Sequence, residues 1–338
     1  MSANEPILEV EGLKTHFFTK AGVVRAVDDV SFSLGKGEIM GLVGESGSGK
    51  SVTGFSILGL VDEPGRIAWG RIAFEGEDLR LASEERKRQL RGSRIAAIFQ
   101  DPLMTLNPVL RIGTQMAEAV QAHARVDRPE ALRRSVAALE RVGIPSARER
   151  LAAYPHQFSG GMRQRVSIAI ALLNDPALII ADEPTTALDV TIQAQILHEM
   201  RDLCASSGSS LIWITHDLSV IAGLADTVCV MYAGRIVERG CVDDILTRPL
   251  HPYTRGLIRS VPSRSERGSE LYQIPGMAPA PLSLGPECAF RDRCPRADRA
   301  CASAPPETAP AETAPPGTAP GVSRTVRCHH PHGAEETV

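Results

Sequence analysis

A glycine-rich loop near the start of the chain has the residue types and spacing of a phosphate-binding loop, G-x-x-x-x-G-K-[ST]. Its residues are Gly44, Glu45, Ser46, Gly47, Ser48, Gly49, Lys50 and Ser51. The glycines let backbone N–H groups turn toward phosphate oxygens, and a following helix adds its positive N-terminal end. We expect Lys50 to reach the β- and γ-phosphates and Ser51 to bind Mg²⁺. A chance glycine-rich turn is the alternative, but this loop follows an apolar run and precedes a helical pattern.

Two adjacent carboxylates, Asp182 and Glu183, follow a second apolar run at residues 178–181. In a parallel sheet, ligands bind at the carboxyl ends of the strands. Asp182 is then placed to hold Mg²⁺, directly or through water, and Glu183 to polarise an attacking water as a general base. A solvated strand end is the alternative, and the phosphate-binding loop in the same chain makes it the weaker one.

Residues Ser159, Gly160 and Gly161 form a possible second anion-binding helix start. Ser159 can cap the helix that follows, and the two glycines leave their N–H groups accessible. Alone, this pattern favours an ordinary N-cap. Its position shortly before Asp182 and Glu183 favours phosphate binding instead.

The chain contains seven cysteines, and four of them, Cys288, Cys294, Cys301 and Cys328, lie near its end. Converging thiolates could hold a four-iron–four-sulfur (4Fe–4S) cluster or tetrahedral zinc. Structural zinc sites favour pairs two to four residues apart, which are absent here, and free or redox-labile thiols are a third possibility. We expect three nearby histidines to lie in a solvated tail, although they could replace a cysteine as ligands: His329, His330 and His332. We expect the other three cysteines to be small core residues: Cys204, Cys229 and Cys241.

The elements that must position these residues alternate between strands and helices. A period-2 pattern at Val30, Phe32 and Leu34 predicts a half-buried strand. Continuous apolar runs predict buried strands at residues 39–43, 177–181, 210–215 and 227–231. Helical patterns follow Lys50, fill 111–150 with breaks at prolines 129 and 145, and cover 192–203. This alternation predicts an α/β fold with a parallel sheet covered on both faces.

Length and charge are those of an ordinary folded protein of roughly two domains. The 338 residues carry a net charge of −3, which argues against a mainly nucleic-acid-binding surface. No apolar run approaches the ~18 residues of a membrane span, and the N-terminus lacks a signal-peptide pattern, so we expect a cytoplasmic protein. Residues 302–321, rich in Ala, Pro, Thr and Glu, are expected to form an extended flexible loop.

Taken together, these motifs resemble those of the ATP-binding cassette (ABC) ATPases. The resemblance rests on the Ser159-Gly160-Gly161-x-x-Gln-Arg motif shortly before the Asp182-Glu183 strand end, and further family motifs follow in order. It implies that Phe17 stacks on adenine, Gln100 senses Mg²⁺ and the γ-phosphate, and His216 acts as the switch histidine. Residues 186–189, which end at Asp189, match the D-loop. Met162 replaces the usual glutamine, so any contact by that side chain is lost.

Membership of this family would imply a P-loop ATPase domain at residues 1–247, with a helical subdomain at about 101–165 and an extension at 248–338. Two cassettes bind head to tail in the family, so that the Ser159 helix start of one chain faces the nucleotide of the other. The second ATPase subunit is then identical or paralogous, and ATP holds the pair together until hydrolysis.

The resemblance narrows to the dipeptide/oligopeptide importer ATPases. It rests on residues 100–102 with 105–108, on 154–161 and 181–191, and on His251-Pro252-Tyr253-Thr254. It implies two membrane permease subunits, docked near residues 105–108, an extracytoplasmic solute-binding protein, and a place on the cytoplasmic face of the inner membrane. It also points to a 4Fe–4S cluster on the four C-terminal cysteines. Nickel importers share much of the pattern.

Two other classes of function stay open at this point. A non-transport ABC ATPase of translation or DNA repair is disfavoured, because the chain has one cassette and no heptad repeat. A redox-sensing module that binds nucleotide without hydrolysing it is suggested by the four cysteines, although Glu183 and His216 are both present.

Overall fold

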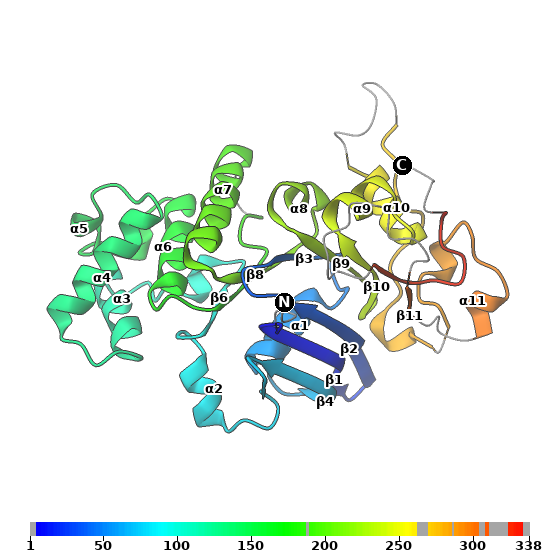
Figure 1. Ribbon diagram of the computed structural model, residues 1–338, viewed down its shortest axis with the longest axis horizontal. Helices are drawn as coiled ribbons and strands as arrows, with labels where there is room; N and C mark the ends of the chain where they lie inside the picture. Colours follow the sequence, from blue (N-terminus) through cyan, green and yellow to red (C-terminus); the bar gives the residue numbers. More distant parts are fainter. Residues whose placement is uncertain are drawn as a thin grey trace. The chain divides into compact units, whose positions relative to one another are not determined.

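The structure is a computed structural model that describes residues 5–186, 189–261, 270–285, 287–303, 308–310 and 324–333. Figure 1 labels its helices and strands. Its residues pack as two units. Unit 1 comprises residues 1–7, 35–38 and 81–213, and unit 2 comprises residues 8–34, 39–80 and 214–338. Within the described ranges, no helix has the length and apolar character needed to cross a membrane.

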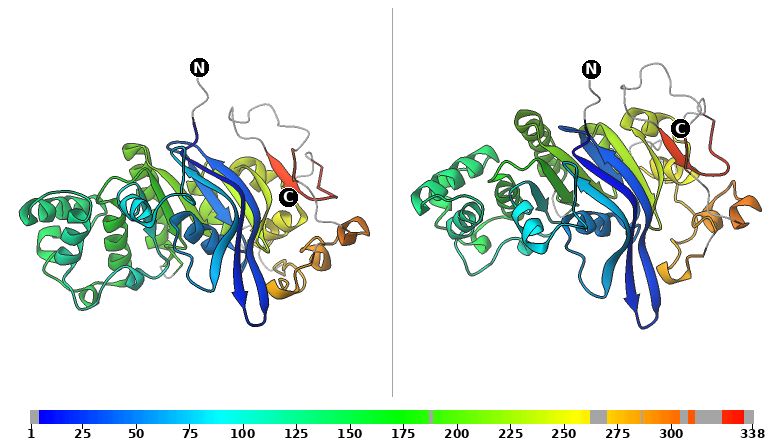
Figure 2. Two further views of the ribbon diagram at one scale, coloured as in Figure 1. Left: turned by 90° about the horizontal axis from the view of Figure 1, so that it is seen from below. Right: turned by 60° about the horizontal axis from the view of Figure 1, so that its bottom comes forward.

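An antiparallel sheet forms the N-terminal part of unit 2, with the strand order β2-β1-β4-β5. Its strands are β1 (Leu8–Thr19), β2 (Gly22–Leu34), β4 (Gly65–Phe74) and β5 (Glu77–Asp78). β1 and β2 form the long blue hairpin in Figure 2. Val30, Phe32 and Leu34 are buried and alternate with more exposed residues, which confirms the period-2 prediction.

A second group of strands in unit 2 carries the glycine-rich loop. β3 (Ile39–Val43) runs parallel to β9 (Thr227–Tyr232), and β10 (Arg235–Cys241) pairs with β9 in the antiparallel sense. β3 and β9 are buried along their whole lengths, as predicted from their continuous apolar runs. Ile221 of α8 (Leu218–Leu224) packs against Gly41 so closely that a Cβ there would lie 2.8 Å from its side chain.

The C-terminal extension packs within unit 2, together with the glycine-rich loop. α9 (Val242–Thr247) directly precedes it, and its elements are α10 (Pro252–Arg259), η4 (Pro281–Ser283), η5 (Arg291–Arg293), α11 (Ala300–Ser303), β11 (Thr308–Pro310) and β12 (Thr325–Arg327). The expected flexible loop at 302–321 is therefore partly wrong, since β11 pairs with β12, which pairs with β10. Backbone pairing at a sheet edge needs no apolar side chain and tolerates proline. Residues 304–307 and 311–321 lie outside the described residues.

In unit 1, β6 (Ile95–Ile98) runs parallel to β7 (Leu178–Asp182), and β8 (Ser210–Thr215) begins here and ends in unit 2. α6 (Gly160–Leu172) packs on β6, and α7 (Val190–Ser207) covers the helix expected at 192–203. The strands expected at 177–181 and 210–215 are confirmed. The sequence analysis missed α2 (Glu84–Leu90), although Ser83 caps it by accepting a hydrogen bond from the Arg86 N–H.

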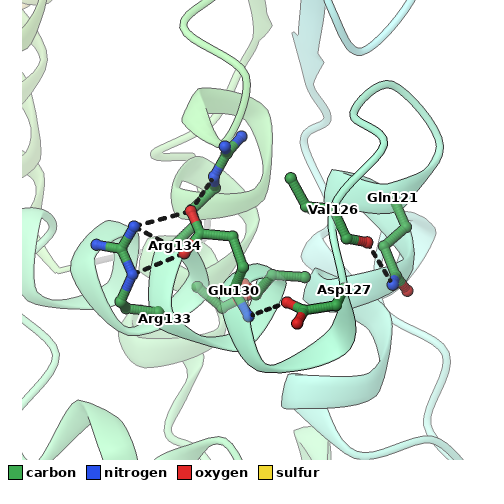
Figure 3. A network of polar contacts seen from close by, with 8 residues as sticks. Gln121, Val126, Asp127, Glu130, Arg133 and Arg134 are labelled. Atoms are coloured by element: carbon green, nitrogen blue, oxygen red, sulfur yellow. Dashed lines mark hydrogen bonds and ion pairs between the residues drawn. The ribbon is translucent and has the colours of Figure 1, made fainter.

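Short helices fill much of the region expected to be a helical subdomain. They are η1 (Pro102–Met104), α3 (Ile112–Gln121), α4 (Arg128–Arg141), α5 (Ala147–Arg150) and η2 (Pro155–Gln157). The predicted breaks hold, because Pro129 lies in the first turn of α4 and Pro145 lies between α4 and α5. Figure 3 shows Asp127 accepting from the Glu130 N–H (3.0 Å) and the Glu130 carboxylate between Arg133 and Arg134.

Candidate functional site

The glycine-rich loop joins β3 to α1 (Lys50–Leu58) in unit 2, as the sequence predicts. Two of its positions require glycine. A Cβ at Gly44 would lie 2.2 Å from the Met231 carbonyl oxygen, and one at Gly49 would lie 2.3 Å from that of Ala26. Gly49 also has φ of +101°, in the left-handed region. The backbone of the loop is thus fixed by its contacts with β9 and β2.

Lys50 is almost fully buried, and its ammonium group points back into the loop. Nζ donates hydrogen bonds to the carbonyl oxygens of Gly44 (2.8 Å) and Glu45 (3.1 Å), and the Ser48 N–H also donates to Glu45 O (3.2 Å). Ser51 lies half-buried in the first turn of α1. A charged amine, exposed loop N–H groups and a helix N-terminus together suit a polyphosphate.

Unit 2 also contains Phe17 and His216. Phe17 lies half-buried on β1, and its ring packs over Gly65 of β4, its register partner. Thr15 on the same strand shares a 2.7 Å hydrogen bond with Ser56 of α1, which fixes this part of β1 to the helix after the loop. His216 is exposed directly after β8, just before Asp217, which caps α8 by accepting from the Ser219 N–H (2.8 Å).

Unit 1 brings Gln100, Asp182 and Glu183 to one edge of its parallel strands. Ile98 of β6 is the register partner of Ala181 of β7, so the residues that follow both strands leave the sheet at the same edge. Gln100 is exposed, Asp182 ends β7, and Glu183 adopts a left-handed φ of +45°. Non-glycine residues adopt this conformation rarely, and such residues cluster at active sites. The Thr186 hydroxyl donates to Glu183 Oε2 (3.1 Å).

Unit 1 also contains a cavity of about 640 Å³. Both Asp189 and the helix start at Ser159, which are predicted site residues, line it. Ser159 caps α6 by accepting from the Met162 N–H (3.3 Å), and Asp189 caps α7 by accepting from the Ile192 N–H (3.0 Å). A Cβ on Gly160 would meet nothing within 4 Å, so this helix start is open. Ala187 and Leu188 of the expected D-loop lie outside the described residues.

An exposed apolar segment follows Gln100. Leu103, Met104 and Val109 are 52%, 73% and 75% exposed, whereas Leu106 between them is buried. The segment is held by hydrogen bonds from the Asn107 N–H to Gln115 Oε1 (2.8 Å) and from Gln115 Nε2 to Asn107 O (3.0 Å). Ordered backbone with outward apolar side chains is typical of an interaction surface.

The four C-terminal cysteines gather in unit 2 as free thiols, of which Cys301 is buried and the other three are half-buried. The Cys288 N–H donates to Cys301 O (3.0 Å). Burial raises the pKa of Cys288, and the neighbouring Cys301 and Cys294 raise it further. Burial also raises the pKa of Cys328, to about 11, with contributions from the other three thiols. These mutual effects place the four thiols near one another, and burial disfavours the thiolate form of Cys288, Cys294 and Cys328.

Two tail histidines are more firmly placed than the expected solvated tail. His330 Nε2 lies 2.9 Å from Asp298 Oδ1, and the His332 N–H donates to Leu250 O (2.8 Å). In the described chain, the only three potential metal ligands whose donor atoms all lie within 4.8 Å of one another are Asp298, Cys301 and His330. Cys204 and Cys229 are core residues as expected, whereas Cys241 is half-buried.

The sequence analysis did not foresee two contacts with the glycine-rich loop: it named Tyr253 only as part of the motif at residues 251–254, and it did not name Arg293. Tyr253 accepts a hydrogen bond from the Glu45 N–H (2.8 Å), and Arg293 forms a two-pronged ion pair with the Glu45 carboxylate. The one feature of the sequence that could have drawn attention to Arg293 is its position directly before Cys294. Its partner lies 248 residues away in the chain, so no spacing rule could identify it.

Comparison with known proteins gives consistent results. The family described as "ABC transporter" matches residues 27–186, and "Oligopeptide/dipeptide transporter, C-terminal region" matches residues 237–301. The chain is 47% identical to the Bacillus subtilis "Oligopeptide transport ATP-binding protein AppD" over 98% of this chain and 99% of that protein. It is 48% identical to the Salmonella typhimurium protein OppD of the same description, over 89% of each.

Solved structures show the same fold. The dimeric ATP-binding cassette MJ0796 bound to ADP and phosphate superposes with a TM-score of 0.63 at 23% identity, over 70% of this chain and 98% of that one. CbiO1 from Clostridium perfringens gives 0.61 at 26% identity, over 71% and 90%. The predicted α/β fold is therefore confirmed. The motifs, the two family matches and the near full-length relatives lead to one conclusion: the chain belongs to the ATP-binding proteins of ABC transporters with the oligopeptide/dipeptide C-terminal region, and it is an ATPase.

Proposed function

We propose that this ATPase powers the import of dipeptides or oligopeptides through partner permease subunits. The observation that carries the proposal is the 47–48% identity, along nearly the whole chain, to proteins described as oligopeptide transport ATP-binding proteins. The match to the oligopeptide/dipeptide transporter C-terminal region adds independent support, because this region lies outside the ATPase motifs.

In the proposed ATP site, the glycine-rich loop binds the phosphates, with Lys50 transferring its hydrogen bonds from the loop carbonyls to the β- and γ-phosphates. Phe17 stacks on adenine. Ser51, Gln100 and Asp182 would hold Mg²⁺, which when bound neutralises charge on the phosphates. The oxygen donors of these three side chains suit that ion.

Hydrolysis in this proposal depends on Glu183 and His216. Glu183 accepts a proton from the attacking water, and the oxygen of that water forms a bond to the γ-phosphorus as the bond to ADP breaks. His216 orients the γ-phosphate. The strained backbone of Glu183 and its hydrogen bond from Thr186 support a fixed carboxylate at this position.

A second ATPase subunit completes each site in the proposal. Gly160 and its neighbours leave an open helix N-terminus beside Asp189, in a cavity of about 640 Å³ within unit 1. The γ-phosphate bound by the partner chain would fill this opening, which needs anion-binding N–H groups and no side chain at Gly160.

The permease partners are proposed to dock at the apolar segment around Leu103, Met104 and Val109. This segment follows directly on Gln100, so a displacement there would reach a residue proposed to hold Mg²⁺. The protein would accordingly act on the cytoplasmic face of the inner membrane, held there by two permease subunits and fed by an extracytoplasmic solute-binding protein.

The four C-terminal cysteines are proposed to hold a 4Fe–4S cluster. Four thiols near one another have the donor chemistry for it. Zinc on the same four sulfurs needs S–S separations of about 3.8 Å. No three cysteine sulfurs in the described chain lie within 4.8 Å of one another, so zinc would require these sulfurs to move closer together. Anaerobic purification with iron, sulfide and zinc quantification decides between these.

The function is tested by Glu183→Gln in the full importer reconstituted in vesicles. We expect peptide-stimulated phosphate release to fall by about 10²–10⁴-fold while ATP binding persists. Normal hydrolysis by the variant would refute Glu183 as the base. Stimulation by nickel ions and not by peptide would keep the ATPase mechanism and reject the peptide substrate.

A further inference from the structure

Glu45 places a carboxylate inside a loop that must accept a polyanion. It is the second residue of the glycine-rich loop, and its carbonyl oxygen already accepts hydrogen bonds from Lys50 Nζ and the Ser48 N–H. An unpaired carboxylate at this position would repel phosphate and leave the side chain free to pull on the loop. Arg293 of the C-terminal extension pairs with Glu45, which compensates the negative charge and holds the side chain in place.

Arg293 neutralises the Glu45 carboxylate. Its Nη1 lies 2.8 Å from Oε2 and its Nη2 lies 3.0 Å from Oε1, which is the two-pronged geometry that only arginine provides. The Arg293 side chain is 7% exposed, and that of Glu45 is 30% exposed. Such a pair is largely shielded from water, so its geometry is well defined and its loss is costly.

The guanidinium of Arg293 is held on its other sides by the extension and β9. Its Nε donates to Pro275 O (2.9 Å), and Nη1 also donates to the Tyr232 hydroxyl (3.3 Å). The ring of Tyr232 contacts those of Tyr253 and Phe290, with centroids 4.6 and 5.2 Å away. Arg293 therefore occupies one position, fixed by this aromatic cluster, from which it can hold Glu45.

The same short segment carries the cysteines. η5 (Arg291–Arg293) lies between Cys288 and Cys294, and the turn is closed by hydrogen bonds from the Arg291 N–H to Cys288 O (3.1 Å) and from the Cys294 N–H to Arg291 O (3.2 Å). Any change in the positions of Cys288 and Cys294 must move this single turn, and with it the guanidinium.

We propose that Arg293 is a positioning residue of the ATPase, which transmits the state of the four-cysteine site to the phosphate-binding loop through Glu45. With the cysteines held together, Arg293 neutralises and fixes Glu45, and the loop is ready to bind ATP. When the turn at residues 291–293 is displaced, the negative charge of Glu45 is no longer compensated, its side chain is no longer held, and affinity for ATP falls. This coupling stands on the ATPase activity and not on the peptide substrate.

The test is a double-mutant cycle on the purified full-length chain, with equilibrium binding of Mg-ATP as the readout. We expect Arg293→Gln to weaken Mg-ATP binding about tenfold, because a charge-assisted hydrogen-bonded pair is lost. In a Glu45→Gln background, the same change should alter affinity by less than about twofold, because there is no carboxylate left to neutralise. Equal effects in both backgrounds, or none in either, would overturn the proposal.

Three further variants separate positioning from general loss of structure. Arg291→Gln is the matched control, since Arg291 lies in the same turn but pairs with exposed Asp292 and with Glu287, and should leave ATP affinity unchanged. Cys294→Ser should weaken ATP binding in the native background and add little to Arg293→Gln. Arg293→Lys keeps the charge without the two-pronged geometry and should restore part of the affinity, and it carries the test if the glutamine variant does not fold.

Kinetics in the reconstituted importer supply the second readout. Because Arg293 touches no reacting atom, Arg293→Gln should raise the KM for ATP about tenfold and change kcat by no more than about twofold. Amide hydrogen exchange of residues 44–51 should be faster in this variant and unchanged in Arg291→Gln. A fall in kcat at constant KM would contradict the inference, and it would leave the proposed import function intact.

Discussion

Two glycine-rich helix starts, one before α1 and one before α6, are built in opposite ways. In the loop at 44–51, Ser46 and Gly47 are exposed, but Lys50 and Ser48 are only 5% and 4% exposed, and two of the glycines touch backbone from other strands. At the start before α6, Ser159 and Gly160 are exposed, Gly161 is half-buried, and nothing approaches a Cβ built on Gly160. Contacts within unit 2 hold the loop before α1 in place. The helix start before α6 has the open form of a surface that binds another molecule.

The difference teaches that similar local chemistry can serve two tasks. Both sites offer a helix N-terminus to an anion. The loop before α1 has its lysine in place and its acidic residue paired with Arg293, which suits the phosphate binding that we propose for the single chain. The start before α6 has only its cap and its N–H groups, which suits a nucleotide brought by a second chain.

The largest expected effects come from one variant in each of the two sites, one measured by ATP binding and the other by ATP hydrolysis. Lys50→Ala should weaken ATP binding to the single chain on the order of 10³-fold, because a buried charged partner of phosphate is removed. Ser159→Asp keeps an N-cap acceptor but adds a negative charge. It should leave single-chain binding intact and lower hydrolysis by the assembled importer about 100-fold.

Ser159→Asn, which caps the helix without charge, is the control for the second half of that prediction. Equilibrium binding of Mg-ATP and steady-state phosphate release are the two measurements. The comparison fails if Ser159→Asp weakens ATP binding to the isolated chain as much as Lys50→Ala does.

The next largest effect concerns how the extension is anchored beside the first loop. Glu238 is fully buried, pairs with Arg324 at 3.0 Å, and accepts the N–H groups of Leu250 and His251. Glu238→Gln should destabilise the chain by about 3 kcal/mol or more, because the Arg324 charge stays buried without its partner. Arg71→Gln removes exposed pairs with Glu9 and Glu11 and should cost less than about 1 kcal/mol.

Urea unfolding of these two variants and the native chain measures the contrast. Similar losses for both variants would mean that the buried pair contributes no more than a surface pair, and that the extension is held by its apolar contacts alone.

A third prediction compares the same substitution in the two loops. Gly49→Ala places a Cβ against the Ala26 carbonyl at a left-handed φ and should destabilise the fold by about 1–3 kcal/mol. Gly160→Ala meets open space at a helix start and should change stability by less than about 0.5 kcal/mol. Thermal unfolding of the two variants checks this. Equal shifts in Tm would show that glycine is no more necessary at position 49 than at position 160.

The last prediction is a pH dependence of stability in unit 2, where His251 lies. Burial lowers the pKa of His251 to about 3, so the folded chain keeps this side chain neutral while the unfolded chain protonates it near pH 6.5. The folded state then binds fewer protons, and its stability should fall as the pH drops below 6.5, by about 1.4 kcal/mol per pH unit at most. This loss should continue down to about pH 3.

His251→Asn isolates that contribution. Asparagine can still cap α10 by accepting from the Tyr253 N–H, as the His251 ring does at 3.0 Å, but it cannot ionise. Urea unfolding between pH 7 and pH 5 should show a shallower decline for the variant. Parallel curves for the two proteins would show that the burial of His251 has no effect on acid stability.

Much of the fold could be predicted from the sequence because its strands follow simple patterns. The five buried residues of β3 and the alternation along β2 both indicate strands directly. α2 was missed because it is short and polar, and β11 because a Thr-Ala-Pro repeat has the composition of a loop. The strand pairing of β11 comes from β12, which no local pattern reveals.

By itself the sequence determined the two helix starts, the carboxylates after β7 and the family. Each depends on residues within a few positions of one another, where backbone geometry follows directly from residue type. Only the tertiary structure decided what surrounds Glu45. Arg293 and Tyr253 reach it from 248 and 208 residues away, and Arg324 reaches Glu238 across 86. Ion pairs and hydrogen bonds of this kind depend on distance in space, and folding alone sets that distance.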